Sequence, residues 1–193
     1  MRLVMASANP HKAIEIADVL REALPEAEIV PRPGDLGDVA ENGETLAENA
    51  LIKARFVHAA TGEPAIADDT GLEVDALGGA PGVHSARYAG PGADPIANLA
   101  KLMAALVDVP PPRRTARFRT VVAVVFGDGR EVLADGLVEG AIATAPRGDH
   151  GFGYDPVFVP DEAAPLTFAE MTSDAKNRIS HRGRALRALA RQL

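Results

Sequence analysis

Short apolar stretches alternate with helix-start signals in the first third of the chain, and this order constrains the fold more than any other feature. Residues 3–6 are apolar and predict a buried strand, and Asn9 followed by Pro10 marks the start of a helix. Further on, Thr45 and Glu48 have the spacing of a capping box at the start of a second helix. Strands that alternate with helices in this way are typical of an α/β fold.

The rest of the chain extends this pattern with an antiparallel insertion. The first helix is expected to bury the apolar residues that fall on one face at helical spacing, which are Ile14, Ala17, Leu20 and Leu24. The other expected elements are strands at 28–30, 65–67 and 72–77, a long loop at 78–92, a helix opened by Asp94 and Pro95, and a hairpin from 117 to 144 around Gly127-Asp128-Gly129. We therefore expect one domain over residues 1–193, built on a long mixed sheet.

Composition narrows the functional classes. Acidic residues outnumber basic ones 27 to 20, giving a formal net charge of -7, so a nucleic-acid partner is not expected. The sequence has no cysteine, which excludes thiolate nucleophiles and cysteine-held metals, so any metal must be bound by oxygen or imidazole. It also has no signal-peptide core and no membrane-length apolar run, and we expect a cytoplasmic protein without a membrane partner.

The first candidate site is the segment at residues 7–12, which reads Ser7-Ala8-Asn9-Pro10-His11-Lys12. Its small residues would let backbone N–H groups approach an anion, and the N-terminus of the helix that follows adds positive potential. Lys12 would supply a full charge beside a phosphate. The alternative is an ordinary strand-to-helix turn with a surface lysine, because the segment lacks Walker-type spacing.

Carboxylates form the second candidate site. Glu41 and Glu44 lie in a loop, while Asp68 and Asp69 follow a strand directly before Thr70. Adjacent acids at the end of a buried strand repel each other unless a cation or a donor compensates. Oxygen ligands of this kind suit Mg²⁺, which completes its shell with waters and substrate phosphate oxygens. A turn with helix-capping acids is the alternative.

Two further segments carry aromatic rings and hydrogen-bond donors. The run Gly151-Phe152-Gly153-Tyr154-Asp155-Pro156 combines flexible backbone with two rings, as a base-stacking pocket requires, although an ordinary turn with core aromatics would have the same composition. Near the C-terminus, cationic and neutral donors gather in a short span that contains Lys176, Ser180, His181 and Arg182.

Four segments, in one order, carry a resemblance to a known family. They are SANPHK at 7–12, ENGETLAENALIKA at 41–54, AIADDTGLEVDALGGAPGVHSARYAG at 65–90, and GFGYDPVF with ISHRG near the end. Together they closely resemble the inosine triphosphate pyrophosphatase family, the non-standard purine nucleoside triphosphate pyrophosphatases, over essentially the whole chain. The resemblance implies an elongated α/β fold with two lobes flanking a central nucleotide-binding cleft, a homodimer, and Mg²⁺-dependent hydrolysis between the α and β phosphates.

The same resemblance implies roles for single residues. Glu41 and Asp69 resemble the metal site, and Asp69 also resembles the proton acceptor. Segment 7–12 resembles the phosphate-side loop, Lys53 a triphosphate contact and Thr70 a substrate contact. The residues that resemble nucleotide contacts, chiefly to the base, are Phe152, Gly153, Tyr154, Asp155, Lys176, His181 and Arg182. The sequence departs from the family at Ala8, where many relatives have glycine, and at Thr70, where serine is frequent.

The expected reaction converts ITP, dITP or XTP to the monophosphate and pyrophosphate, and two rival functions stay open beside it. A nucleotide-binding sensor without turnover would use the same lysines and rings, but it has no need for the acids Glu41, Asp68 and Asp69. A diphosphatase acting on ordinary or pyrimidine nucleotides would use the same chemistry as the expected enzyme.

Overall fold

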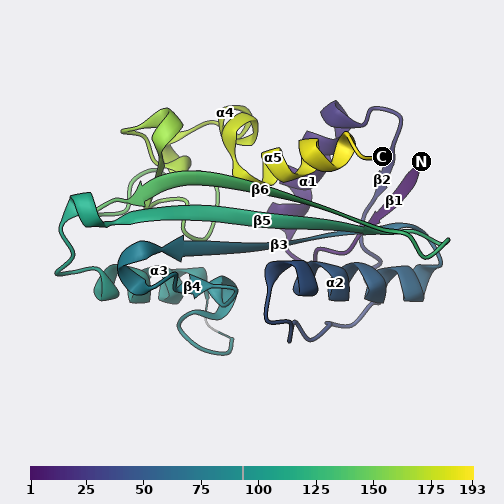
Figure 1. The fold of residues 1–193 in the computed structure, drawn as a ribbon, viewed down its shortest axis with the longest axis horizontal. Coiled ribbons are helices and arrows are strands. Elements are labelled where there is room, and N and C mark those ends of the chain that lie inside the picture. The colour runs from purple at the N-terminus through teal and green to yellow at the C-terminus, as the bar shows by residue number, and fades with distance from the viewer. Residues whose placement is uncertain (93) are drawn as a thin grey trace. The chain divides into compact units, whose positions relative to one another are not determined.

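The computed structural model describes residues 1–92 and 94–193 and has a mixed α/β architecture (Figure 1). Its strands are β1 (Arg2–Met5), β2 (Glu28–Val30), β3 (Ala65–Val74), β4 (Pro81–Gly82), β5 (Thr115–Val125), β6 (Glu131–Ile142) and β7 (Phe158–Pro160). Its helices are α1 (Pro10–Ala23), α2 (Leu46–Thr61), α3 (Pro95–Ala105), α4 (Ser173–Ile179) and α5 (His181–Ala190). The strand order is β2-β1-β3-β5-β6-β7, with β4 paired to β3, which confirms the predicted α/β fold with a mixed sheet.

The chain folds into two compact units. Unit 1 comprises residues 1–69, 120–136 and 181–193, and unit 2 comprises residues 70–119 and 137–180. Strands β3, β5 and β6 each contribute residues to both units.

In unit 1, helices cover both faces of the sheet. Strand β1 runs parallel to β2 and to β3, and its successive side chains point to opposite faces. Leu3 and Met5 pack with α1 and α5 on one face, while Val4 and Ala6 pack with α2 on the other. Figure 1 shows α1 and α5 on one side of these strands and α2 on the other. Any residue of β1 or β3 therefore faces one of two distinct helical layers.

Helix α1 buries a face that only partly matches the predicted one, since Leu20 is buried and Leu24 packs against the same core, as expected. Ile16, Val19 and Leu20 are buried, whereas Ile14, which was expected in the core, is 62% exposed. Both sets of residues repeat at helical spacing, so the local pattern does not separate them. The choice is made by packing, because the buried face of α1 lies in one cluster with Leu186 of α5.

Helices α2 and α3 start where predicted. Thr45 caps α2, and its hydroxyl and the Glu48 side chain form the reciprocal hydrogen bonds of a capping box. Asp94 caps α3 by accepting a hydrogen bond from the Ala97 N–H. Within the described residues, no helix combines the length and the apolar character that a membrane span requires.

Unit 2 is built around an aromatic cluster. The rings of Phe118 and Phe158 lie 4.7 Å apart between centroids, and those of Phe158 and Phe168 lie 5.1 Å apart. Leu102 and Leu106, at the end of α3, belong to the same core. Tyr154 and Val157, in the segment after β6, pack into this same core.

The predicted long loop at residues 78–92 is more regular than expected. It contains strand β4 and a single 3-10 turn at residues 85–87, and another such turn directly precedes it. The Ser85 hydroxyl accepts a hydrogen bond from the Leu72 N–H at 2.9 Å and donates one to the Gly82 carbonyl at 2.6 Å. One buried side chain therefore ties the segment to β3, a link between distant residues that glycine and proline content does not reveal.

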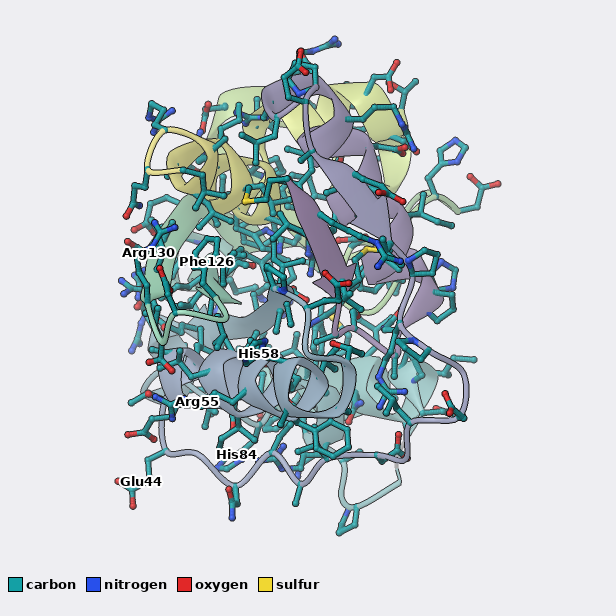
Figure 2. The ribbon with its side chains drawn as sticks, turned by 90° about the vertical axis from the view of Figure 1, so that its right-hand side faces the viewer. Glu44, Arg55, His58, His84, Phe126 and Arg130 are labelled. Carbon is teal, nitrogen blue, oxygen red and sulfur yellow. The ribbon has the colours of Figure 1, made fainter. Side chains whose placement is uncertain are left out.

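The predicted hairpin around Gly127-Asp128-Gly129 joins β5 to β6. The Phe126 N–H donates to the Arg130 carbonyl at 2.9 Å, and Gly129 has a φ of +84°, which only glycine adopts without strain. The Arg130 guanidinium lies 3.9 Å from the centre of the Phe126 ring (Figure 2).

Candidate active site

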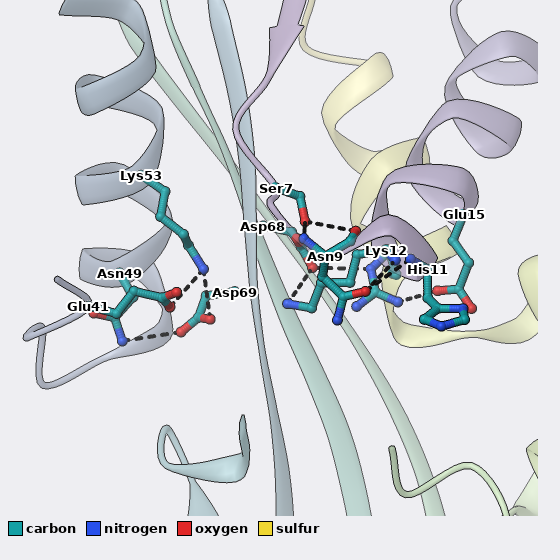
Figure 3. Close-up of polar contacts among 11 residues, drawn as sticks. Ser7, Asn9, His11, Lys12, Glu15, Glu41, Asn49, Lys53, Asp68 and Asp69 are labelled. Carbon is teal, nitrogen blue, oxygen red and sulfur yellow. Dashed lines mark hydrogen bonds and ion pairs between the residues drawn. The ribbon is translucent and has the colours of Figure 1, made fainter. Parts of the chain in front are cut away.

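The two neighbouring aspartates lie within a strand, not at its end as predicted. Strand β3 continues through Asp68 and Asp69 to Val74. Because successive residues of a strand point to opposite faces, Asp68 faces α1 and α5 while Asp69 faces α2. Figure 3 shows the two carboxylates among different partners. The expected repulsion between them is relieved by their separation, by Lys53 on one face and by Lys12 and Arg182 on the other, so the strand need not end there.

On the α2 face, Lys53 joins the carboxylates of two segments. Its Nζ lies 2.9 Å from Glu41 Oε2 and 3.0 Å from Asp69 Oδ1. Burial raises the pKa of Asp69 above its usual value, although Lys53 opposes the shift. For Lys53 itself, burial would lower the pKa, but Asp69, Asp68 and Glu41 outweigh it and raise the pKa. Asp69 thus combines a raised pKa with a fixed ammonium partner.

Asn49, which the sequence did not single out, also contacts Asp69. Its Nδ2 donates to Asp69 Oδ2 at 3.2 Å, and its Oδ1 accepts from the Gly43 N–H at 2.8 Å. Asn49 lies four residues before Lys53 on α2, so the two side chains share one helix face. That spacing relative to Lys53 is the signal that could have found it.

On the other face, Asp68 is held by two cations. Lys12 Nζ lies 3.3 Å from Asp68 Oδ2, and Arg182 Nε donates to the same oxygen at 3.1 Å. Arg182 is 1% exposed and also pairs with Glu15 of α1, a second residue that sequence reasoning missed. Burial alone would raise the pKa of Asp68, but Lys12 and Arg182 outweigh it and hold the pKa far below its usual value.

The start of α1 has the geometry of a capped helix. Asn9 is the N-cap, and its side chain accepts hydrogen bonds from the His11 and Lys12 N–H groups. Ala8 does not require a glycine-like conformation, since glycines alone have positive φ among the described residues. Burial lowers the pKa of Lys12 despite the nearby Asp68 carboxylate. The predicted phosphate-binding role of segment 7–12 stays a prediction.

In unit 2, Asp155 organises the segment Gly151 to Asp155. Its Oδ2 accepts a hydrogen bond from the Phe152 N–H at 2.8 Å and from Lys176 Nζ at 2.6 Å. Lys176 Nζ also lies 5.0 Å from the centre of the Phe152 ring. Gly151 has a φ of +74°, and a side chain there would collide with the Asp155 carboxylate. The run is therefore an ordered turn that brings Phe152, Asp155 and Lys176 together.

Tyr154 differs from its neighbours in this turn because it belongs to the core. The side chain is buried, and its hydroxyl donates to the Ser85 carbonyl at 2.9 Å. Burial raises the pKa of Tyr154 above its usual value. Of the two rings, the partly buried Phe152 is the better placed to stack against a nucleobase.

The predicted site residues divide between the two units. Unit 1 holds segment 7–12, Glu41, Lys53, Asp68, Asp69, His181 and Arg182, and unit 2 holds Thr70, Phe152, Gly153, Tyr154, Asp155 and Lys176. Within residues 1–92 and 94–193, no three Asp, Glu or His side chains gather as a metal site. Glu41 and Asp69 do converge on Lys53 Nζ, and these two carboxylates could hold a metal. Direct metal binding by Asp68 stays a prediction.

Comparison with known proteins places this arrangement in a family. Residues 3–192 match the model of the Ham1 family. The chain belongs to the Ham1 family. This confirms the family resemblance predicted from the four sequence segments, and the match extends across both units of the Ham1 fold.

Curated Ham1 relatives are similar over nearly their full length. The chain is 50% identical to a dITP/XTP pyrophosphatase of Porphyromonas gingivalis, covering 97% of this chain and 95% of the relative. It is 52% identical to a dITP/XTP pyrophosphatase of Symbiobacterium thermophilum, covering 96% and 91% of the two chains.

Solved structures of Ham1 relatives agree with the fold. A HAM1 protein from Coxiella burnetii has a TM-score of 0.86 and 41% identity, covering 100% of this chain and 98% of that one. A nucleoside-triphosphatase or dITP/XTP pyrophosphatase from Mycobacterium abscessus has a TM-score of 0.75 and 45% identity, covering 98% and 97%.

Proposed function

We propose that this Ham1 protein hydrolyses non-standard purine nucleoside triphosphates, such as dITP, ITP and XTP, to the monophosphate and pyrophosphate. The observation that carries the proposal is the convergence of Glu41, Lys53 and Asp69, which combines two carboxylates and an ammonium, with Lys53 and Asp69 buried. The relatives named dITP/XTP pyrophosphatase, at 50% and 52% identity over nearly the whole chain, support the substrate class.

We further propose that the enzyme depends on Mg²⁺. Glu41 Oε2 and Asp69 Oδ1 both lie within 3.0 Å of Lys53 Nζ, so hard oxygen donors from a loop and a strand meet at one point. This fits Mg²⁺, which binds through one or two carboxylates together with phosphate oxygens and water. When bound, Mg²⁺ neutralises phosphate charge and polarises phosphoryl oxygens.

Asp69 would act as the general base toward the attacking water. Its raised pKa brings it closer to the working pH than an exposed aspartate, and the Lys53 ammonium fixes its direction. Lys12 would bind phosphate oxygens, because burial lowers its pKa and an added anion would stabilise its charged form. Lys53 would stabilise the charge that develops on the pyrophosphate leaving group.

A substrate panel tests the proposal. Pyrophosphate release would be measured with ITP, dITP, XTP, GTP, ATP and a pyrimidine triphosphate, each with and without Mg²⁺. We expect Mg²⁺-dependent release from the first three. Binding without release would identify a nucleotide sensor, and equal release from all six would identify a diphosphatase without base selectivity. The homodimer and the cytoplasmic location stay predictions.

The position of water attack gives a first prediction about the reaction. Attack at the α-phosphorus should release intact pyrophosphate in one step. Hydrolysis in heavy-oxygen water should then place the label in the monophosphate, as read by mass spectrometry. Label in pyrophosphate, or stepwise release of orthophosphate through the diphosphate, would contradict this geometry.

Glu41→Gln should weaken Mg²⁺ binding more than the chemical step. The amide keeps the shape of the side chain but lacks its charge, so the Mg²⁺ concentration needed for half-maximal activity should rise. High Mg²⁺ should restore part of the lost rate. Glu44→Gln in the same loop serves as the control, since Glu44 makes no contact with Lys53 among the described hydrogen bonds and ion pairs. Loss that Mg²⁺ does not relieve would count against Glu41 as a ligand.

Base selectivity should depend on His181. Inosine and xanthosine carry a 6-keto oxygen that accepts hydrogen bonds, whereas adenosine carries an amino group that donates them, and a donor facing the wrong group costs about 1–3 kcal/mol. We expect His181→Ala to lower kcat/KM for ITP far more than for ATP. Arg182→Ala would be a poorer test, because Arg182 also holds Asp68 and Glu15. An equal fall for both substrates would assign His181 to the phosphates.

A further inference from the structure

Helix α2 contacts both oxygens of the Asp69 carboxylate. Lys53 Nζ lies 3.0 Å from Oδ1, and Asn49 Nδ2 donates to Oδ2 at 3.2 Å. Each carboxylate oxygen has two lone-pair directions, so one donor on each leaves the others available. The two contacts fix the plane of the carboxylate as well as its position, which the ammonium alone would not do.

The orientation of the Asn49 amide is fixed by its other end. The Gly43 N–H donates to Asn49 Oδ1 at 2.8 Å, so this atom must be the carbonyl oxygen and Nδ2 must face Asp69. Asn49 is fully buried, and an amide in such a place is expected to satisfy its polar groups. A reversed amide would place its NH₂ group against the Gly43 N–H and its oxygen against the carboxylate.

The loop that carries Glu41 is shaped to make this contact. A Cβ on Gly43 would lie 2.7 Å from Glu48 Cβ and 2.8 Å from Asn49 Oδ1, closer than real Cβ atoms come. Only a residue without a side chain lets the loop backbone approach the amide here. Asn49 therefore connects the loop of Glu41 to the carboxylate of Asp69 by two hydrogen bonds.

We infer that Asn49 is a positioning residue, whose amide aligns Asp69 for proton abstraction and ties it to the Glu41 loop. This rests on the proposed function, in which Asp69 is the general base. In this role Asn49 acts through Asp69 and is not proposed to contact the substrate. Removing it should therefore lower kcat while KM for ITP changes little, because the misplaced base affects the chemical step.

The chain offers a matched control for this test in Asn98 of α3. Asn98 is also buried, its Oδ1 accepts from the Ala89 N–H at 2.7 Å, and its Nδ2 donates to the Ala86 carbonyl at 3.0 Å. Like Asn49 it both accepts and donates through its amide, but its hydrogen-bond partners in the described part of the chain are backbone groups and not a carboxylate. Asn98→Leu removes an equivalent buried amide in unit 2, so it reports the effect of structural loss alone.

The experiment measures kcat, KM and thermal stability for wild type, Asn49→Leu, Asn49→Asp and Asn98→Leu with ITP and Mg²⁺, with rates divided by the folded fraction. We expect kcat of Asn49→Leu to fall about 10–100-fold, which is the range for losing a residue that orients a functional side chain. The kcat of Asn98→Leu should stay near the wild-type value. Asn49→Asp keeps an acceptor for Gly43 but lacks the donor to Asp69, so it should also lose kcat. It decides the question if Asn49→Leu does not fold.

A merely structural Asn49 gives a different result. Asn49→Leu and Asn98→Leu would then lose thermal stability and keep kcat alike, or Asn49→Asp would turn over at the wild-type rate, and either result overturns the inference. Failure of the proposed function appears elsewhere, as a wild type that releases no pyrophosphate from ITP or an Asp69→Asn variant at full rate. In the Asp69→Asn background, Asn49→Leu should not lower the residual rate further, because both substitutions act on the same general base.

Discussion

Asp69→Asn is expected to lose nearly all turnover of ITP while keeping its fold. The amide has the shape of the carboxylate and can still meet Lys53, but it can neither accept the proton of the attacking water nor bind a metal as well. Loss of a positioned base alone typically costs about 10²–10⁴-fold in rate. Pyrophosphate release under saturating ITP and Mg²⁺ measures the effect, and circular dichroism checks the fold.

A suitable control for Asp69→Asn is Asp75→Asn, just beyond the end of β3. Asp75 accepts hydrogen bonds from Thr115 and Arg117 at an exposed position in unit 2, so its amide variant tests the loss of a paired carboxylate outside the site. The control should keep the wild-type rate. A wild-type rate for Asp69→Asn would remove Asp69 from the role of general base.

The second large effect concerns stability, since Arg182→Met should destabilise the protein by about 3–5 kcal/mol. Arg182 and Asp68 are almost fully buried, and removing one partner of such a pair leaves the other charge in a medium of low polarity. Lys12 remains beside Asp68, but Glu15 also loses its guanidinium. The free energy of unfolding in urea, followed by circular dichroism, measures the change.

Arg21→Met provides the comparison for Arg182→Met. Arg21 pairs with Asp18 at 2.9 Å on the exposed side of α1, with side chains 72% and 45% exposed. An ion pair in such a place contributes about 0–1 kcal/mol. If the free energy of unfolding fell by the same small amount in both variants, the buried network around Asp68 would not be a major contributor to stability.

Local signals in the sequence predicted much of the fold. The capping box of Thr45 and Glu48, the Asn9 and Asp94 caps and the glycine turn of the hairpin depend on residues a few positions apart, and all of them occur in the structure. The buried face of α1 could not be predicted in the same way. It depends on α5, which is more than 150 residues away in the chain.

The candidate site shows the same division. Residue types and family resemblance singled out Asp69, Lys53 and Lys12, but Asp68 was expected beside Asp69 at a strand end, and its metal role stays a prediction. In the structure Asp68 faces Lys12 and Arg182 on the opposite side of β3. A charge pattern alone does not say whether a strand continues through two acids, because the compensating cations come from helices distant in sequence.

The opposite orientation of Asp68 and Asp69 makes residues 65–69 intolerant of length changes. Inserting or deleting a single residue between Ala65 and Asp68 would turn each carboxylate toward the other face, which would bring Asp68 to Lys53 and take Asp69 to Arg182. A two-residue change preserves the alternation but shifts the register of β3 against its neighbours β1 and β5. Natural or engineered variants of this strand should therefore vary by substitution, and viable indels should concentrate in the loop of residues 31–40, which has no strand partner to keep in register.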